Sequence, residues 1–158
     1  HGRYFLERGH PVTLVDRQTE ALLDLGPDPQ ATIVQADLED GSPWPLNEKF
    51  AGVVVANYLH RPLTENLLES LEPGGLLIYE TFARGNENFS RPRNPDHLLK
   101  SGELLQMVLG RLQVIAYEHG IREKSPLHGV IQRICAVKNL DQSVREDREP
   151  QVLNLEPN

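Results

Sequence analysis

Short apolar runs rich in β-branched residues recur along the first half of the chain, and each run ends in polar or acidic residues. The runs cover residues 12–16, 31–36, 50–57 and 76–82. A run of this length, bounded by turn residues, predicts a strand that is buried in a parallel sheet. The pattern therefore predicts that these strands form the centre of an α/β domain.

Segments whose apolar residues predict helices precede, separate and follow these strands. The segments cover residues 2–8, 19–25, 62–71 and 98–109. In the last of them, Ser101 is a candidate N-cap, and Glu103 falls in the first helical turn, where acids are favoured. The alternation of strands and helices predicts βαβ units with right-handed crossovers.

The second half of the chain carries a different pattern. Residues 111–119 and 130–138 alternate like paired strands, and residues 120–129 can join them. We therefore expect a mostly parallel sheet with an antiparallel C-terminal strand, in one domain spanning residues 1–138. Residues 139–158 are polar and charged, which predicts a flexible tail.

Polar side chains gather where the predicted strands end, and in open α/β sheets ligands bind at that edge. Asp16 ends the first run, so its carboxylate can accept the hydroxyls of a nucleoside ribose, or it can cap the following helix. The sequence Asn57-Tyr58-Leu59-His60 follows the third run. Residues 83–95 form a long loop at the same edge, which indicates a lid, a binding segment or disorder.

Charge and composition narrow the choice of partner. Sixteen basic and 23 acidic residues give a formal net charge of −7, which disfavours binding to nucleic acid or to an anionic membrane and favours a small molecule. A single cysteine, Cys135, excludes internal disulfides, and we interpret it as a small buried hydrophobe. The six histidines lack metal-ligand spacing, so no metal site is expected. Without a membrane-spanning run or a signal peptide, we expect a cytoplasmic protein.

Four pieces of sequence, in this order, resemble class I S-adenosyl-L-methionine-dependent methyltransferases, particularly the bacterial small-molecule members related to the tellurite-resistance methyltransferases. The pieces are Val12 to Asp16, Gln35-Ala36-Asp37-Leu38, Val53 to His60, and Leu71-Glu72-Pro73-Gly74-Gly75-Leu76. The resemblance covers about residues 1–138 and implies a Rossmann-like methyltransferase sandwich. It also implies that the glycine-rich loop and the first strand of that fold belong before His1.

The resemblance further implies which residues contact S-adenosyl-L-methionine. Asp16 would bind the ribose hydroxyls, Asp37 would bind the adenine amino group, and Leu38 would lie beside the base. Ala56 and Asn57 would place backbone carbonyls near the cofactor. The full set of implied cofactor-binding residues is Asp16, Arg17, Asp37, Leu38, Ala56 and Asn57.

The residues at the ends of the next two predicted strands are the candidates for contact with the methyl acceptor. Tyr58 and His60 are the candidate catalytic residues; His60 can take a proton from a nucleophile, or it can pack at the start of a helix. Glu80, Phe82 and Arg84 are candidates for the wall of the substrate site. Arg84, Arg91 and Arg93 can attract a carboxylate or phosphate, or they can form a solvated basic loop.

Two other functions fit parts of the pattern. An NAD(P)-dependent oxidoreductase also uses an acid at a strand end, and a non-catalytic binding module can retain the fold. The Pro73-Gly74-Gly75 turn and the final strand pair favour methyl transfer to a small molecule.

Overall fold

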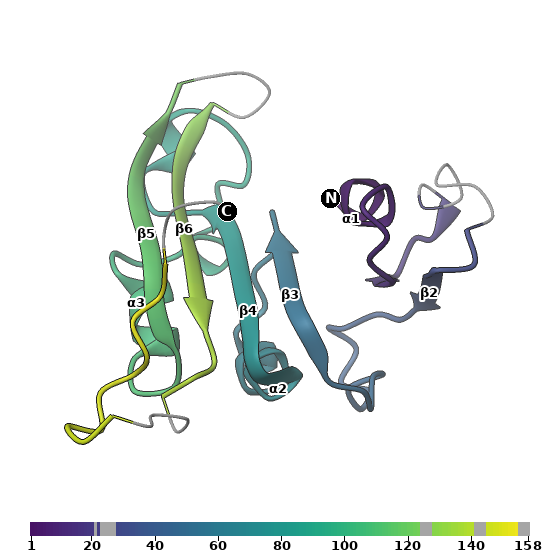
Figure 1. Ribbon diagram of the computed structural model, residues 1–158. Coiled ribbons are helices and arrows are strands. Elements are labelled where there is room, and N and C mark those ends of the chain that lie inside the picture. The colour runs from purple at the N-terminus through teal and green to yellow at the C-terminus, as the bar shows by residue number, and fades with distance from the viewer. Residues whose placement is uncertain (21, 23–27, 124–127, 141–144, 155–158) are drawn as a thin grey trace. The chain divides into compact units, whose positions relative to one another are not determined.

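The computed structural model describes residues 1–20, 22, 28–123, 128–140 and 145–154 (Figure 1). These residues belong to two compact units, His1–Asn47 and Glu48–Asn158. The helix predicted over residues 19–25 lies mostly outside the described residues. The domain boundary predicted after residue 138 stays a prediction.

The first unit contains a short helix and a two-stranded parallel sheet. Helix α1 (Gly2–Leu6) precedes strands β1 (Val12–Asp16) and β2 (Ala31–Gln35). The strands pair in register from Val12 with Ala31 to Asp16 with Gln35. The apolar run at residues 12–16 therefore forms the strand that the sequence predicts, and both strands end at the same edge.

The second unit is built on a four-stranded sheet in the order β3-β4-β6-β5. Its strands are β3 (Phe50–Ala56), β4 (Leu71–Phe82), β5 (Gln113–Arg122) and β6 (Gly129–Val137). β3 is parallel to β4, whereas β6 is antiparallel to both β4 and β5. Hence β3, β4 and β5 run in one direction and β6 runs in the opposite direction, as Figure 1 shows. The predicted antiparallel C-terminal strand is confirmed.

The start of β4 differs from the prediction. The sequence predicts that the helix continues to Leu71 and that the following Pro-Gly-Gly turn breaks it, but Leu71 already pairs with Phe50 in the sheet. Residues 72–75 form an irregularity inside the strand, with Gly74 at φ +82°. A Cβ on Gly75 would lie 2.9 Å from the Phe50 carbonyl oxygen, so the close approach of two backbones requires glycine there.

Short helices cover one face of the second sheet. They are the 3-10 helix η2 (Arg61–Leu63) and the α-helices α2 (Thr64–Glu69) and α3 (Glu103–Val108). On β4, Leu77 and Tyr79 are buried, whereas Leu76 and Ile78, which alternate with them, are exposed. The core therefore lies between the helices and the face of the sheet that carries Leu77 and Tyr79. The helical residues Leu68 and Val108, together with Leu104, are also buried there.

The start of α3 also corrects the sequence interpretation. Ser101 is not the N-cap; the cap is Gly102, in the left-handed conformation at φ +71°, and the helix begins at Glu103. The fully buried Gln132 of β6 instead accepts a hydrogen bond from the Leu104 N–H through its Oε1 (3.3 Å). A side chain distant in sequence thus supplies part of the capping that a local serine was expected to provide.

The long loop after β4 is folded on itself. It contains the short 3-10 helices η3 (Asn86–Asn88) and η4 (Pro95–His97). Asn86 is completely buried and donates from Nδ2 to the Pro92 carbonyl (3.0 Å). The Arg84 N–H donates to the Leu99 carbonyl (2.9 Å), which closes the segment at its base. Internal hydrogen bonds therefore hold this loop in a folded form, and its role as a lid or a binding segment stays a prediction.

Candidate functional site

The carboxyl edge of the first sheet carries two aspartates. Asp16 ends β1, and Asp37 follows the end of β2 by two residues. Both are exposed, and each uses Oδ1 to accept the N–H two residues ahead, at 2.8 Å from Gln18 and 2.9 Å from Glu39. Within the described residues, no hydrogen bond engages either Oδ2. Each carboxylate is therefore oriented by its own turn while one oxygen stays available to a ligand.

The other two predicted cofactor contacts in this unit lie beside the aspartates. Arg17 is exposed and Leu38 is half-buried. Gln35, which is not among the predicted cofactor-binding residues, donates from Nε2 to the Arg17 carbonyl (3.1 Å) and links the two strand ends. The Ala36 N–H donates to the Asp16 carbonyl (3.1 Å). The edge around Asp16 is thus held by contacts from both strands.

The carboxyl end of β3 turns sharply at Asn57. Ala56 is the last strand residue, and Asn57 has φ +55°, in the left-handed region that few residues other than glycine adopt. Its N–H donates to the Glu80 carbonyl (2.9 Å), which maintains pairing with β4 up to this point. Uncommon backbone conformations of this kind concentrate at binding sites, and asparagine tolerates the region at low cost.

The residues after Asn57 are fixed through the backbone. The Tyr79 hydroxyl donates to the Tyr58 carbonyl (2.9 Å), and Leu59 is buried. His60 is half-buried and forms the N-cap of η2, but its side chain makes no capping hydrogen bond. The structure thus gives His60 a place at a helix start without a hydrogen-bonding role there for its imidazole.

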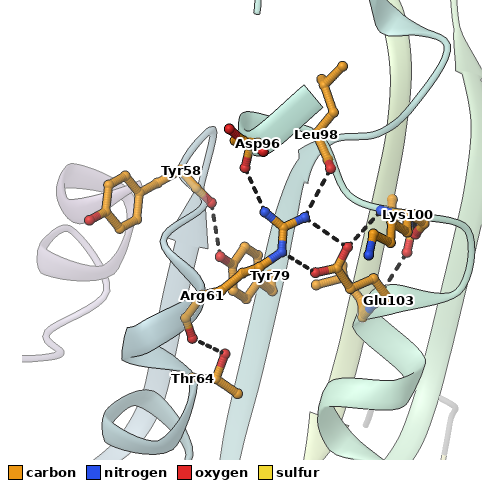
Figure 2. A network of polar contacts seen from close by, with 10 residues as sticks. Tyr58, Arg61, Thr64, Tyr79, Asp96, Leu98, Lys100 and Glu103 are labelled. Carbon is orange, nitrogen blue, oxygen red and sulfur yellow. Dashed lines mark hydrogen bonds and ion pairs between the residues drawn. The ribbon is translucent and has the colours of Figure 1, made fainter. Parts of the chain in front are cut away.

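Arg61 lies at the centre of a polar network (Figure 2). Its Nε donates to Glu103 Oε1 (2.6 Å) and its Nη2 to Glu103 Oε2 (3.0 Å). Its Nη1 donates to the Asp96 carbonyl (2.6 Å), and Nη2 also donates to the Leu98 carbonyl (3.1 Å). The Lys100 N–H adds a further hydrogen bond to Glu103 Oε2 (2.7 Å). One guanidinium thus joins η2, the end of η4 and the start of α3.

The charges of this network stabilise one another. The side-chain hydrogen bond to Glu103 raises the pKa of Arg61 above its ordinary value. Burial raises the pKa of Glu103, but the hydrogen bonds from Arg61 and the Lys100 N–H outweigh it and lower the pKa overall. Burial also raises the pKa of Tyr79, so its phenol stays protonated and remains a donor to Tyr58.

Glu80 is engaged in ion pairs with two arginines that the sequence interpretation did not single out. Glu80 Oε1 accepts from Arg122 Nη1 at 2.8 Å, and Glu80 Oε2 lies 3.6 Å from Arg133 Nη1. Arg133 also donates from Nε to Glu118 Oε2 (2.7 Å). Because Glu80, Arg133 and Glu118 are opposite one another on β4, β6 and β5, strand register predicts these contacts once the pairing is known.

The remaining candidates for the substrate wall lie in different environments. Phe82 is 8% exposed and packs with Leu98 and Ile131 in the core. Arg84 is exposed. The described structure thus places the Phe82 ring in the core of the second unit, and its predicted substrate contact stays a prediction.

Other features of the described residues bear on chemistry. Cys135 is half-buried, and burial raises the pKa of its thiol, which disfavours the nucleophilic thiolate.

The described residues contain no group of three or more His, Cys, Asp or Glu side chains that could hold a metal ion. None of the helices within the described ranges is both long and apolar enough to cross a bilayer.

No family model matches the sequence, and no curated protein matches it. Solved structures do match. The N-methyltransferase NodS from Bradyrhizobium japonicum WM9 is 16% identical with a TM-score of 0.62, over 87% of this chain and 80% of NodS. A second NodS structure is a complex with S-adenosyl-L-homocysteine.

Two further matches extend the comparison. TehB from Haemophilus influenzae is 15% identical with a TM-score of 0.61 over 82% of this chain, which spans 50% of TehB. The 16S rRNA (adenine(1408)-N(1))-methyltransferase from Catenulisporales acidiphilia, as its D21A mutant, is 16% identical with a TM-score of 0.53, over 87% of this chain and 82% of that enzyme. At such identities the similarity concerns the fold, and the chain has the Rossmann-like fold of class I S-adenosylmethionine-dependent methyltransferases.

Proposed function

We propose that this protein transfers a methyl group from S-adenosyl-L-methionine to a small-molecule acceptor. One observation carries the proposal: in a chain with this fold, β1 ends in an exposed aspartate whose carboxylate is oriented by its own turn. Asp16 can therefore receive ribose hydroxyls through Oδ2 while Oδ1 holds the Gln18 N–H. Charge-assisted hydrogen bonds of this kind are the stronger ones in proteins.

The adenosyl group would meet residues of the same edge. Asp37, oriented in the same way as Asp16, would accept the adenine amino group, and the half-buried Leu38 would lie beside the base. Arg17 completes this set. In the second unit, the left-handed conformation of Asn57 turns the backbone at the end of β3, and we assign the Ala56 and Asn57 carbonyls to the cofactor.

Methyl transfer needs little acid–base catalysis from the protein. Bound S-adenosyl-L-methionine supplies a methyl group on a sulfonium centre that is already activated. The protein's contribution is then to hold the acceptor in line and exclude water, and such positioning is worth several kcal/mol of barrier. Tyr58 and His60 would contact the acceptor, and His60 would take its proton. Glu80 and Arg84 are the proposed polar wall.

A small acceptor fits the charge of the chain. The net charge of −7 is unfavourable for binding a polyphosphate backbone. The enzyme from Catenulisporales acidiphilia has this fold and acts on 16S rRNA, so the fold by itself does not decide the acceptor. We place this protein with the small-molecule enzymes on the ground of charge. The cytoplasmic location expected from the sequence stays a prediction.

A transfer assay tests the proposal. The full-length protein is incubated with S-adenosyl-L-methionine labelled in its methyl group, a fractionated small-molecule extract and, separately, total RNA. We expect label in the small-molecule fraction. Label recovered in RNA would contradict the acceptor class. Binding of S-adenosyl-L-homocysteine without any transfer would favour a non-catalytic binding module, and reduction of a nicotinamide cofactor would favour an oxidoreductase.

A further inference from the structure

We propose that Arg61 is a positioning residue that fastens two segments together: the strand-end segment, residues 57–60, and the loop-end segment, residues 94–99. The significance of this contact for methyl transfer rests on the proposed function, because Tyr58 and His60 lie in the strand-end segment. The contact itself is a property of the fold and can be tested without an acceptor.

The Arg61 guanidinium uses all of its nitrogens in hydrogen bonds. Nε and Nη2 donate to the carboxylate of Glu103. Nη1 donates to the Asp96 carbonyl, and Nη2 also donates to the Leu98 carbonyl. A paired guanidinium and carboxylate have a fixed relative orientation. Arg61 therefore fixes position and direction together, which a lysine ammonium cannot do.

The loop-end segment is held in place through hydrogen bonds to its backbone groups. Arg61 binds two carbonyl groups that flank His97, and the Asn94 side chain accepts the Asp96 N–H (3.0 Å). The Leu99 N–H donates to the Phe82 carbonyl (3.0 Å) just beyond these residues. The place of this segment is therefore set by Arg61 on one side and by the end of β4 on the other.

The strand-end segment is held by contacts at both of its ends. Its first part is fixed by the Asn57 N–H on the Glu80 carbonyl and by the Tyr79 hydroxyl on the Tyr58 carbonyl. Arg61 follows His60 directly and anchors the other end, as Figure 2 shows. The backbone that carries Tyr58 and His60 is thus held at both ends, and loss of the Arg61 contacts would free the end next to His60.

Hydrogen exchange measured by mass spectrometry tests the contact directly. In Arg61→Met, we expect about tenfold faster exchange in peptides that cover the strand-end and loop-end segments, as for a lost charge-assisted hydrogen bond. Arg61→Lys should restore only part of the protection. Glu103→Gln keeps the shape of the side chain that Arg61 binds, so the exchange rate in the same peptides should increase less than in Arg61→Met.

Arg111 provides a matched control. It donates from Nη1 to both carboxylate oxygens of Glu65 (3.1 and 3.0 Å), and both side chains are well exposed. Arg111→Met should leave exchange in both segments unchanged. Unchanged exchange in Arg61→Met, or an increase spread evenly over the second unit, would overturn the proposal, because Arg61 would then have no local positioning role.

A kinetic measurement links the contact to function. With the unmethylated acceptor identified through the wild-type assay, Arg61→Met should lower kcat/KM about tenfold or more, while the Kd for S-adenosyl-L-homocysteine stays within about twofold. A change in that Kd with no change in transfer would refute the positioning of Tyr58 and His60. If wild type methylates no acceptor, the proposed function fails, and the exchange data alone decide the role of Arg61.

Discussion

Gly129, the first residue of β6, lies directly against the buried side chain of Asn86. A Cβ at this position would overlap with Asn86 Oδ1, and Asn86 has no exposed surface into which it could move. We therefore predict that Gly129→Ala lowers the free energy of unfolding by about 1–3 kcal/mol, the usual cost of overpacking. Urea denaturation followed by circular dichroism measures this change.

Gly120 of β5 is the control for this prediction. Apart from Gly120 itself and its two neighbours in the chain, no heavy atom lies within 4 Å of the Cβ position there. Gly120→Ala should stay within about 0.5 kcal/mol of wild type. Equal effects of the two substitutions would mean that Asn86 can move aside and that the contact is not tight.

Gln132 is a fully buried amide that serves two backbone groups. Its Oε1 accepts from the Leu104 N–H, and its Nε2 donates to the Lys100 carbonyl (2.6 Å). Gln132→Leu would leave both groups without this partner, so we predict a loss of about 1–3 kcal/mol in the free energy of unfolding. The exposed Gln106→Leu on α3 is the matched control, and a comparable loss there would contradict the assignment.

The start of α3 makes stability depend on pH through Glu103. Its pKa in the folded protein is lowered below the ordinary value of 4.5. Its contribution is therefore fully present above that value and is lost as the pH falls through the folded pKa. We predict that the difference in unfolding free energy between wild type and Glu103→Gln is constant near neutral pH and shrinks in acid below about pH 4.5. A difference that does not change with acidification would rule out this linkage.

Elements whose signals are local were predicted well. The apolar run at residues 12–16 forms β1 with the predicted bounds, and the alternating pattern near residues 130–138 forms β6. The spacing of Leu71 from Leu67 and Leu68 predicts a helix, whereas pairing with β3 places Leu71 in a strand. Backbone pairing across a sheet is not encoded in local periodicity.

The candidate site was predicted less completely, for the same reason. Strand ends could be located, so Asp16 and His60 were found as candidates. The contacts of Arg61 with Glu103 and of Glu80 with Arg122 each join residues 42 positions apart, and the pair of Glu80 with Arg133 depends on strand register. No short motif carries such information. The structure therefore adds the supporting residues to a set of candidates that the sequence provides.

At the scale of the whole molecule, the proposed roles divide between the two units. The residues assigned to the adenosyl group through their side chains, Asp16 and Asp37, belong to the first unit, and the residues assigned to the acceptor belong to the second. We therefore predict that His60→Gln impairs methyl transfer to the acceptor identified in the wild-type assay, while the Kd for S-adenosyl-L-homocysteine stays within about twofold. A Kd that rises in parallel with the loss of transfer would contradict this division.

The central claim is that this fold binds an adenosyl cofactor through Asp16. Isothermal titration of the full-length protein with S-adenosyl-L-homocysteine measures this most directly. We predict binding by wild type and a loss of about 1.5–3 kcal/mol in Asp16→Ala, which is roughly a 10- to 150-fold higher Kd. Failure of wild type to bind, or an unchanged Kd in a folded Asp16→Ala variant, would contradict the account and leave Asp16 as a residue that only caps its own turn.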